Sequence, residues 1–471
     1  MKALKVLLVQ PPIPPEVELY STADMVAPSM GLAYLAAVLE QNGYHVEILD
    51  APAFELTYED LSGEFKRRKP DIVGVTATTA VAPSAFKTAQ IAKKVLPDSL
   101  VVMGGGHITF IPVETMKAEP SIDVGVIGEG EYTFLELVET WEKGGDLSKV
   151  KGLILRRKDG SLHFTPPRPL IQNLDELPFP ARHLLPMERY RVFGKHITLG
   201  LIFTSRGCPY NCVFCSSSLL FGKKFRARSP RNVVDEVEEF VEKYKSDHVE
   251  FVDDLFIFDK KRVEAICREI RERGLDISWV CSARVDSADL ELFKTLRKAG
   301  CVMIYLGVES GVQRVLNLMR KGTKVEQAVR AVRMAKEAGL QVVASFVLGI
   351  PGETWEEALE TIRFAKKLDP DFAQFSLATP FPGTALYHMA KEKGLLLTED
   401  WTKYTVLKPV MRTEELSEKQ LEKLIRKAYF DFYLRPKIIW RYIRRGHAKE
   451  LLVNVMGKYL WRYFKAKLGL T

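Results

Sequence analysis

Long apolar runs are missing from this 471-residue chain, and cysteine is scarce in it. No run approaches the about 18 apolar residues that a membrane-spanning helix needs, which excludes an integral span. Six cysteines are too few for a disulfide-rich secreted protein of this length, so we expect a reducing, cytoplasmic environment. The first residues lead through a short Val-Leu run into Pro11 and Pro12, which predicts a strand rather than a cleavable signal.

An excess of positive charge is also missing from most of the chain, although the formal net charge is +8. Residues 435–471 contain ten Lys or Arg and one acidic residue, Glu450, so this tail carries +9 and the rest carries −1. The body therefore has no net charge that would attract polyanions, and we do not expect nucleic acid to be a partner.

Residues 1–145 alternate short apolar strands with amphipathic helical segments, a pattern typical of a parallel sheet covered by helices on both faces. This α/β pattern predicts a flavodoxin-like, Rossmann-type order, in which ligands bind beyond the carboxyl ends of the strands. The predicted strands are Leu4–Val9, Val46–Leu49, Ile72–Thr76, Leu100–Met103 and Val124–Ile127. Residues 146–197 predict a small hairpin and a connector.

Strand–helix alternation resumes over residues 198–400 and predicts a partial (β/α)6 barrel. The predicted strands are Leu199–Thr204, Val249–Val252, Ile277–Cys281, Val302–Gly307, Val342–Leu348 and Phe372–Ser376. Residues 401–471 predict a helical C-terminal region that becomes basic and aromatic.

Three cysteines lie within eight residues, Cys208, Cys212 and Cys215. Clustered thiolates in an intracellular chain usually ligate a metal centre, and a structural zinc would need a fourth ligand close by. None follows closely, since the nearest downstream histidine is His248. A [4Fe–4S] cluster takes one ligand per iron, so three cysteines leave one iron open for a substrate or cofactor. The remaining cysteines, 267, 281 and 301, predict small buried side chains.

The Cys-x3-Cys-x2-Cys spacing resembles the signature of the radical S-adenosylmethionine (SAM) superfamily, and short segments at later strand ends resemble it too. The resemblance implies that the cluster cleaves SAM reductively and that the resulting 5′-deoxyadenosyl radical attacks an unactivated carbon, with electrons from an external donor. It implies SAM contacts for an aromatic residue before the third cysteine and for residues at three later strand ends: Phe214, Asp253, Asp254, Glu309, Ser310, Gly349, Pro351, Gly352 and Glu353.

Four short segments of the N-terminal region, Gly31–Ala36, Val46–Ala51, Gly104–His107 and Gly128–Glu131, resemble the cobalamin-binding domain that precedes the barrel in one branch of this superfamily. The resemblance implies corrin contacts for residues at several strand ends: Asp50, Thr76, Thr78, Gly104, Gly105 and Gly106. The usual Asp-x-His-x-x-Gly motif is absent, because reading from Asp50 places Pro52 at the histidine and Glu55 at the glycine. Any bound cobalamin is therefore expected to be His-off. His107, in the glycine-rich loop, is expected to be structural.

The tail interleaves aromatic and basic residues, and Trp440, Ile443 and His447 share a helical face. Such a helix suits a membrane interface, although a helix packed on the barrel with a solvated charged face gives the same pattern. We expect an apolar substrate, such as a lipid or isoprenoid, and a peripheral location on the inner face of the membrane. The expected reaction is C–C bond formation: methyl transfer with cobalamin, or ring closure or coupling without it. The alternative is an RNA-modifying enzyme that binds nucleic acid through the tail.

Overall fold

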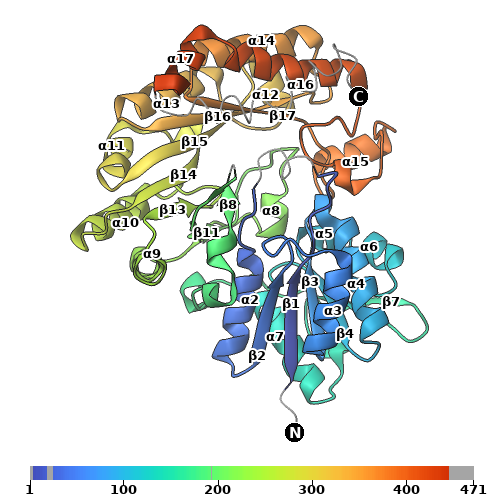
Figure 1. Ribbon diagram of the computed structural model, residues 1–471. Helices are drawn as coiled ribbons and strands as arrows, with labels where there is room; N and C mark the ends of the chain where they lie inside the picture. The colour runs from blue at the N-terminus through green and yellow to red at the C-terminus, as the bar shows by residue number, and fades with distance from the viewer. Residues whose placement is uncertain (1–3, 18–24, 193, 445–471) are drawn as a thin grey trace.

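Two parallel sheets, one in each half of the chain, form the framework of the protein (Figure 1). The computed structural model describes residues 4–17, 25–192 and 194–444. The basic and aromatic residues that the sequence places after Arg444, His447 among them, lie outside these ranges.

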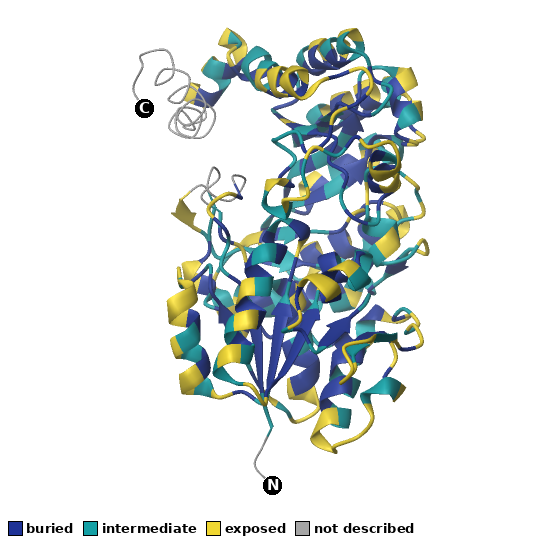
Figure 2. Ribbon diagram, turned by 90° about the vertical axis from the view of Figure 1, so that its right-hand side faces the viewer, coloured by how far each residue is buried: buried dark blue, intermediate teal, exposed yellow. Residues whose placement is uncertain are grey.

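The N-terminal sheet has the strand order β2-β1-β3-β4-β5 that the sequence predicts for a flavodoxin-like domain, and all five strands are parallel. Its strands are buried on both faces, as parallel strands between two helical layers must be (Figure 2). The strands are β1 (Lys5–Gln10), β2 (His45–Asp50), β3 (Ile72–Thr76), β4 (Leu100–Gly104) and β5 (Val124–Val126).

Two helical layers cover this sheet. Leu8 of β1 packs in one core with α2 (Met30–Gln41) and α7 (Glu131–Glu142). The adjacent Leu7 points to the other face, because side chains alternate along a strand. That face is covered by α3 (Tyr58–Arg68), α4 (Ala82–Val95), α5 (Gly106–Phe110) and α6 (Pro112–Ala118).

The hairpin predicted inside the 146–197 connector belongs to the N-terminal sheet. Its strands β6 (Leu153–Arg156) and β7 (Leu162–Phe164) continue the sheet beyond β5 in antiparallel orientation. The sheet therefore extends beyond the residue-145 boundary, and β7 rather than β5 forms this edge. The rest of the segment contains short 3₁₀ turns and the two-residue strands β8 (Arg191–Val192) and β9 (Lys195–His196).

The second sheet confirms the six predicted strands of the partial barrel, all parallel and in sequential order. They are β10 (Gly200–Ile202), β13 (His248–Phe251), β14 (Ser278–Arg284), β15 (Cys301–Glu309), β16 (Gln341–Leu348) and β17 (Phe372–Leu377). The connecting helices are α9 (Pro230–Tyr244), α10 (Lys260–Glu272), α11 (Leu290–Lys298), α12 (Gln313–Leu318), α13 (Val325–Glu337), α14 (Trp355–Leu368) and α15 (Ala385–Glu392).

Helix α16 (Glu418–Tyr433) completes the outer layer of the barrel beside β17 and α14 (Figure 1). Phe432 and Tyr433 at the end of this helix belong to the core, although the basic and aromatic tail begins directly after them. The Tyr433 hydroxyl donates to the Ala373 carbonyl over 2.8 Å, and Phe432 is fully buried against Phe375.

Helix α17 (Pro436–Arg444) uses one face to dock on the barrel and exposes the other. Ile438 and Tyr442 are buried, whereas Trp440 and Ile443 are 61% and 58% exposed. The sequence predicts this shared face for Trp440 and Ile443, and the structure confirms it.

Three of the basic residues of the tail form ion pairs with another part of the protein. Asp369, which follows α14, lies 2.9 Å from Lys437 Nζ, 3.1 Å from Arg441 Nη2 and 3.6 Å from Arg435 Nη2. Three of the basic residues that the sequence assigns to an external partner therefore hold α17 on the barrel. None of the helices in the described part of the chain combines the length and the hydropathy of a membrane-spanning segment.

We predict that Asp369→Asn loosens α17. Burial raises the pKa of Asp369, but Lys437 and Arg441 outweigh it and hold that pKa below its usual value. A depressed carboxyl pKa stabilises the fold above about pH 4, and this contribution is lost as the pH falls further. Because the group is partly exposed, we expect a loss of about 1 kcal/mol at pH 7 that disappears in acid.

The rate of trypsin cleavage after Lys437 or Arg441 measures the loosening of α17. Urea unfolding at pH 7 and below about pH 4 measures the loss of stability. Asp431→Asn is the matched control, because Asp431 pairs with Lys427 and Lys366 rather than with α17. Equal cleavage rates in Asp369→Asn and wild type would contradict this docking role.

Candidate functional site: a cysteine cluster beside a glycine-lined pocket

The three clustered cysteines lie in a loop bracketed by two short antiparallel strands, β11 (Ser205–Arg206) and β12 (Arg226–Ala227). The Cys208 amide donates to the Gly222 carbonyl over 3.1 Å, which closes the loop. Gly207 has φ +91°, and a Cβ there would lie 2.1 Å from the Lys224 carbonyl oxygen. Only glycine fits this close approach, so the turn directly before Cys208 requires glycine.

The middle of the loop is anchored to the barrel. The Val213 amide donates to the Met319 carbonyl over 3.0 Å, and the Val213 carbonyl accepts from Leu386 over 2.9 Å. Val213 is buried in a small apolar cluster with Met319 and Leu386, and Phe214 packs against the same cluster. The loop is therefore held between the ends of α12 and α15.

The thiols fit an iron–sulfur cluster with one cysteine per iron. Packing of the protein around Cys215 raises its pKa to about 11, and the charges of Asp254, Cys212 and Cys208 add to this. Desolvation also raises the pKa of Cys208. Thiols with raised pKa values release their protons when iron binds. Among the described residues, no three His, Cys, Asp or Glu side chains converge closely enough for one metal ion, and a four-iron cluster does not need such convergence.

The glycine turn predicted to contact SAM lies against the cysteine loop. Ile350 belongs to the same apolar cluster as Val213, and Phe214 packs on it. Gly349 has φ +80°, and a Cβ there would lie 2.5 Å from Leu421 Cδ2, so the turn needs glycine. The structure therefore brings Phe214 together with the turn that contains Pro351 and Gly352.

Glu353 is buried and closes this turn by accepting a hydrogen bond from the Gly349 amide. Burial raises the pKa of Glu353 to about 8, so it is mostly protonated at neutral pH. Its Oε2 atom therefore supports the shape of the turn, and the contact of Glu353 with SAM stays a prediction.

The two aspartates after β13 shape the cysteine loop. Buried Asp253 accepts from the Thr204 amide over 2.6 Å and from Ser205 Oγ over 2.6 Å, at the start of β11. Asp254 accepts from Ser217 Oγ, at the start of α8 (Ser217–Leu220). Burial raises the pKa of both carboxyl groups. Asp253 therefore holds β10 to β13 just before the cysteines.

Glu309 and Ser310 lie at the end of β15, where the strand bulges. Glu309 has φ +66° and pairs with Lys321 over 2.6 Å, both side chains being buried. Ser310 is fully buried, and its Oγ lies 2.9 Å from Thr361 Oγ1. Ser310 therefore stabilises the strand end, whereas Glu309 holds the Lys321 ammonium group at the site.

Sequence reasoning missed two buried cations beside Cys212. Burial lowers the pKa of Lys321, but Glu309 and Cys212 outweigh it and raise that pKa. Arg284 stacks 3.5 Å from the Tyr210 ring centre and donates to the Lys321 carbonyl over 2.8 Å. Arg284 could have been noticed in the sequence, because it ends an apolar strand and a charge buried there needs a partner. Both cations favour negative charge on the thiolates and on an anionic ligand beside them.

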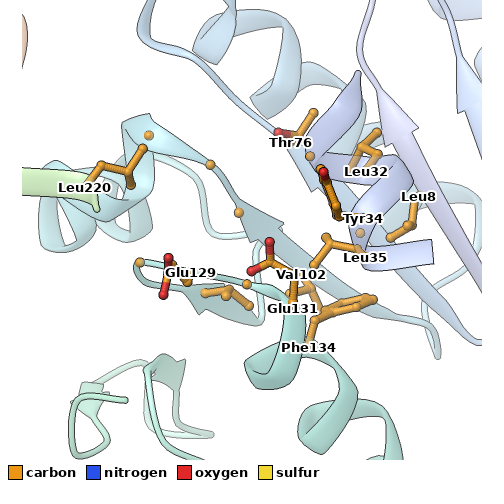
Figure 3. A pocket seen from close by; sticks show the side chains of 18 of the residues that line it. Leu8, Leu32, Tyr34, Leu35, Thr76, Val102, Glu129, Glu131, Phe134 and Leu220 are labelled. Carbon is orange, nitrogen blue, oxygen red and sulfur yellow. The ribbon is translucent and has the colours of Figure 1, made fainter. Parts of the chain in front are cut away.

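A glycine-lined pocket lies between the N-terminal sheet and its α2–α7 layer (Figure 3). It has a volume of about 980 Å³, including the part open to solvent. No atom lies within 4 Å of the Cβ position at Gly31, Gly104 or Gly128, so the backbone there is open to a close ligand. The lining includes four of the residues predicted to contact corrin: Thr76, Gly104, Gly105 and Gly106.

The other wall of this pocket comes from the cysteine-bearing segment: Phe203, Arg206, Leu220 and Phe221 line it. Leu220 faces Glu129 and Tyr34 of the N-terminal domain across the pocket (Figure 3). The pocket is thus built by both domains.

Asp50, Thr78 and His107 do not line this pocket. Asp50 is buried and accepts from the Tyr190 hydroxyl over 2.8 Å, which ties β2 to the connector. Thr78 is exposed before a 3₁₀ turn. His107 is buried against Phe86 and Trp401, and burial lowers its pKa to about 4, in line with the structural role predicted for it.

Comparison with known proteins decides the family. Residues 202–365 match the radical SAM superfamily, and residues 19–138 match the B12 binding domain. An uncharacterised methyltransferase of Pyrococcus horikoshii is 45% identical over 95% of this chain and 96% of its own length. This chain belongs to the radical SAM superfamily, in the branch with a B12-binding domain.

A second sequence relative and a solved structure are also similar to this chain over most of its length. An anaerobic magnesium-protoporphyrin IX monomethyl ester cyclase of Rubrivivax gelatinosus is 31% identical over 93% of this chain and 80% of its own length. The cobalamin-dependent radical SAM enzyme OxsB, solved with aqua-cobalamin and SAM, superposes with a TM-score of 0.78 at 18% identity. That alignment covers 98% of this chain and 73% of OxsB.

The cofactors of the enzyme are therefore a [4Fe–4S] cluster, SAM and cobalamin. The residues present fit them: three thiols for the cluster, the Gly349–Glu353 turn and the Glu309–Lys321 pair beside it, and a glycine-lined pocket for the corrinoid.

We predict that Gly104→Leu blocks the corrinoid pocket and spares the cluster. The new side chain enters open space inside the pocket. The Kd for hydroxocobalamin should rise at least about tenfold, the equivalent of about 1.4 kcal/mol, while bound iron stays near four per chain. Equilibrium dialysis and iron analysis measure the two quantities.

Gly63→Leu is the matched control, because Gly63 also has open space at its Cβ but lies on α3, away from the pocket. Unchanged hydroxocobalamin affinity in Gly104→Leu would show that the corrinoid binds elsewhere.

Proposed function

We propose that the enzyme transfers a methyl group to an unactivated carbon of an apolar substrate, which it takes up at a membrane surface. One observation carries the first part: the segment that bears the three cysteines also forms a wall of the corrinoid pocket. A radical centre and a methyl donor held by one wall can act on the same substrate. The name of the Pyrococcus relative, a methyltransferase, favours methyl transfer over ring closure.

When bound, the cluster and SAM supply a 5′-deoxyadenosyl radical, and cobalamin supplies the methyl group. The protein itself binds, orients and excludes water. Lys321 and Arg284 place positive charge beside Cys212. The Gly349–Glu353 turn offers backbone for close contact with a flat ligand. The chain would draw on an external one-electron donor.

The exposed face of α17 supports uptake from a membrane. Trp440 and Ile443 present apolar surface, and the Arg444 guanidinium lies 5.2 Å from the Trp440 ring centre. Tryptophan beside arginine suits the boundary between headgroups and acyl chains. The cyclase relative is named for a porphyrin ester, so a large macrocyclic substrate is known within the family. An apolar substrate dissolved in a membrane is consistent with both points.

We predict that anaerobically reconstituted enzyme forms 5′-deoxyadenosine and moves label into a lipid when it is given cobalamin, a one-electron donor, SAM with a deuterated methyl group and vesicles of a total lipid extract. Mass spectrometry of nucleosides and lipids measures both products. Cys212→Ala should form neither, because it cannot hold the cluster. If 5′-deoxyadenosine forms but no label moves, ring closure or coupling replaces methyl transfer. Label in added RNA would favour the RNA-modifying alternative.

We also predict that Trp440→Ala weakens binding to phosphatidylglycerol vesicles. If the Trp440 side chain inserts partly into the bilayer, its removal costs roughly 1 kcal/mol of binding free energy and should lower the partition coefficient about fivefold. Vesicle sedimentation measures it. The control is Trp141→Ala, since Trp141 is also exposed but lies on α7. Equal partitioning of Trp440→Ala and wild type would remove the support that α17 gives to membrane uptake.

A further inference from the structure

A buried ion-pair network joins the cysteine-bearing segment to the N-terminal domain. Arg206 Nη1 lies 3.1 Å from Glu129 Oε1, and Arg206 Nη2 lies 2.5 Å from Glu131 Oε1. Arg226 Nη2 lies 3.0 Å from Glu129 Oε1, and the Ile171 amide donates to Glu129 Oε2 over 2.8 Å. All four charged side chains are less than a tenth exposed. Breaking such a pair leaves an uncompensated buried charge, so the contact holds firmly.

The two arginines lie on the two short strands that bracket the cysteines. Arg206 of β11 pairs in register with Arg226 of β12. Arg206 is two residues before Cys208, and the Cys208 amide donates to the Gly222 carbonyl over 3.1 Å. Because this hydrogen bond and the β11–β12 pairing hold the short segment from Arg206 to Cys208 at both ends, a displacement of Arg206 bears directly on Cys208.

The same residues line the corrinoid pocket. Glu129, Glu131 and Arg206 all belong to its wall, and Figure 3 shows both glutamates at the pocket. The Arg206 guanidinium also lies 5.9 Å from the Tyr34 ring centre and 5.6 Å from the Phe221 ring centre, and both rings line the pocket. A ligand in the pocket that contacts these rings or glutamates therefore affects the position of the Arg206 guanidinium.

We propose that Arg206 is a positioning residue that couples occupancy of the corrinoid pocket to the cluster. A bound corrinoid further stabilises the Arg206–Glu131 contact, and this contact in turn stabilises the approach to Cys208. The inference rests on the cluster and cobalamin as cofactors of one enzyme, but it does not depend on which carbon is methylated. Because coupling free energies are reciprocal, assembly of the cluster must change corrinoid affinity by the same factor.

The experiment compares the Kd for hydroxocobalamin in chains with and without a reconstituted cluster, measured by anaerobic equilibrium dialysis. In wild type we expect binding to be tighter with the cluster by about fivefold or more, the usual lower range of coupling between sites. In Arg206→Lys, which keeps the charge but cannot bridge two carboxylates, the ratio should fall to about one. A purely structural role would shift both Kd values equally and leave the ratio unchanged.

Glu131→Gln is the second variant, since it removes the negative charge from one of the two contacts of Arg206 and leaves Glu129 in place. We expect a ratio between those of wild type and Arg206→Lys. The matched control is Arg182→Lys, because Arg182 forms an equally buried pair with Glu236 and does not line the pocket. The control should keep the wild-type ratio.

A wild-type ratio of one, or a wild-type ratio retained by Arg206→Lys and Glu131→Gln, overturns the proposal. These outcomes are independent of product formation. Coupled binding without label transfer would contradict the proposed methyl transfer alone, and label transfer with uncoupled binding would contradict the role of Arg206 alone.

Discussion

The contact between Arg206, Arg226 and Glu129 is the interaction on which the site depends. It joins the loop after β5 to the strands that bracket the cysteines, and it is shielded from water. Buried charges of this kind contribute little net stability relative to apolar packing, but they penalise any arrangement that separates the partners. The network therefore acts chiefly to define one relative position of cluster loop and pocket.

That position follows from a property shared by the two sheets. Parallel sheets present their ligands at the carboxyl ends of their strands, in open sheets and in barrels alike. In this enzyme the pocket at the N-terminal sheet receives Phe203, Arg206 and Phe221 from the segment that follows β10. One composite site thus replaces two separate ones, which a reaction with several cofactors requires.

Much of the fold could be predicted from the sequence, because strand and helix periodicity are local. The eleven predicted parallel strands all form, and the glycines at the strand ends lie where the backbone must approach a ligand. The partners of individual side chains were not predicted. Asp253, Ser310 and Glu353 form hydrogen bonds to Thr204, Thr361 and Gly349, and their contacts with SAM stay predictions. Such partners are 4 to 51 residues away, and spacing alone does not reveal them.

The sequence by itself determined the spacing of the three clustered cysteines, the order of the two sheets and the concentration of positive charge near the C-terminus. Only the tertiary structure decided what those charges do and which residues line the pocket. Asp369 pairs with Lys437 and Arg441 and so uses them to dock α17, and Asp50 accepts a hydrogen bond from Tyr190 outside the lining of the pocket. The physical reason is the same in each case: a charged or polar group acts through its nearest partner, and folding chooses that partner from distant parts of the chain.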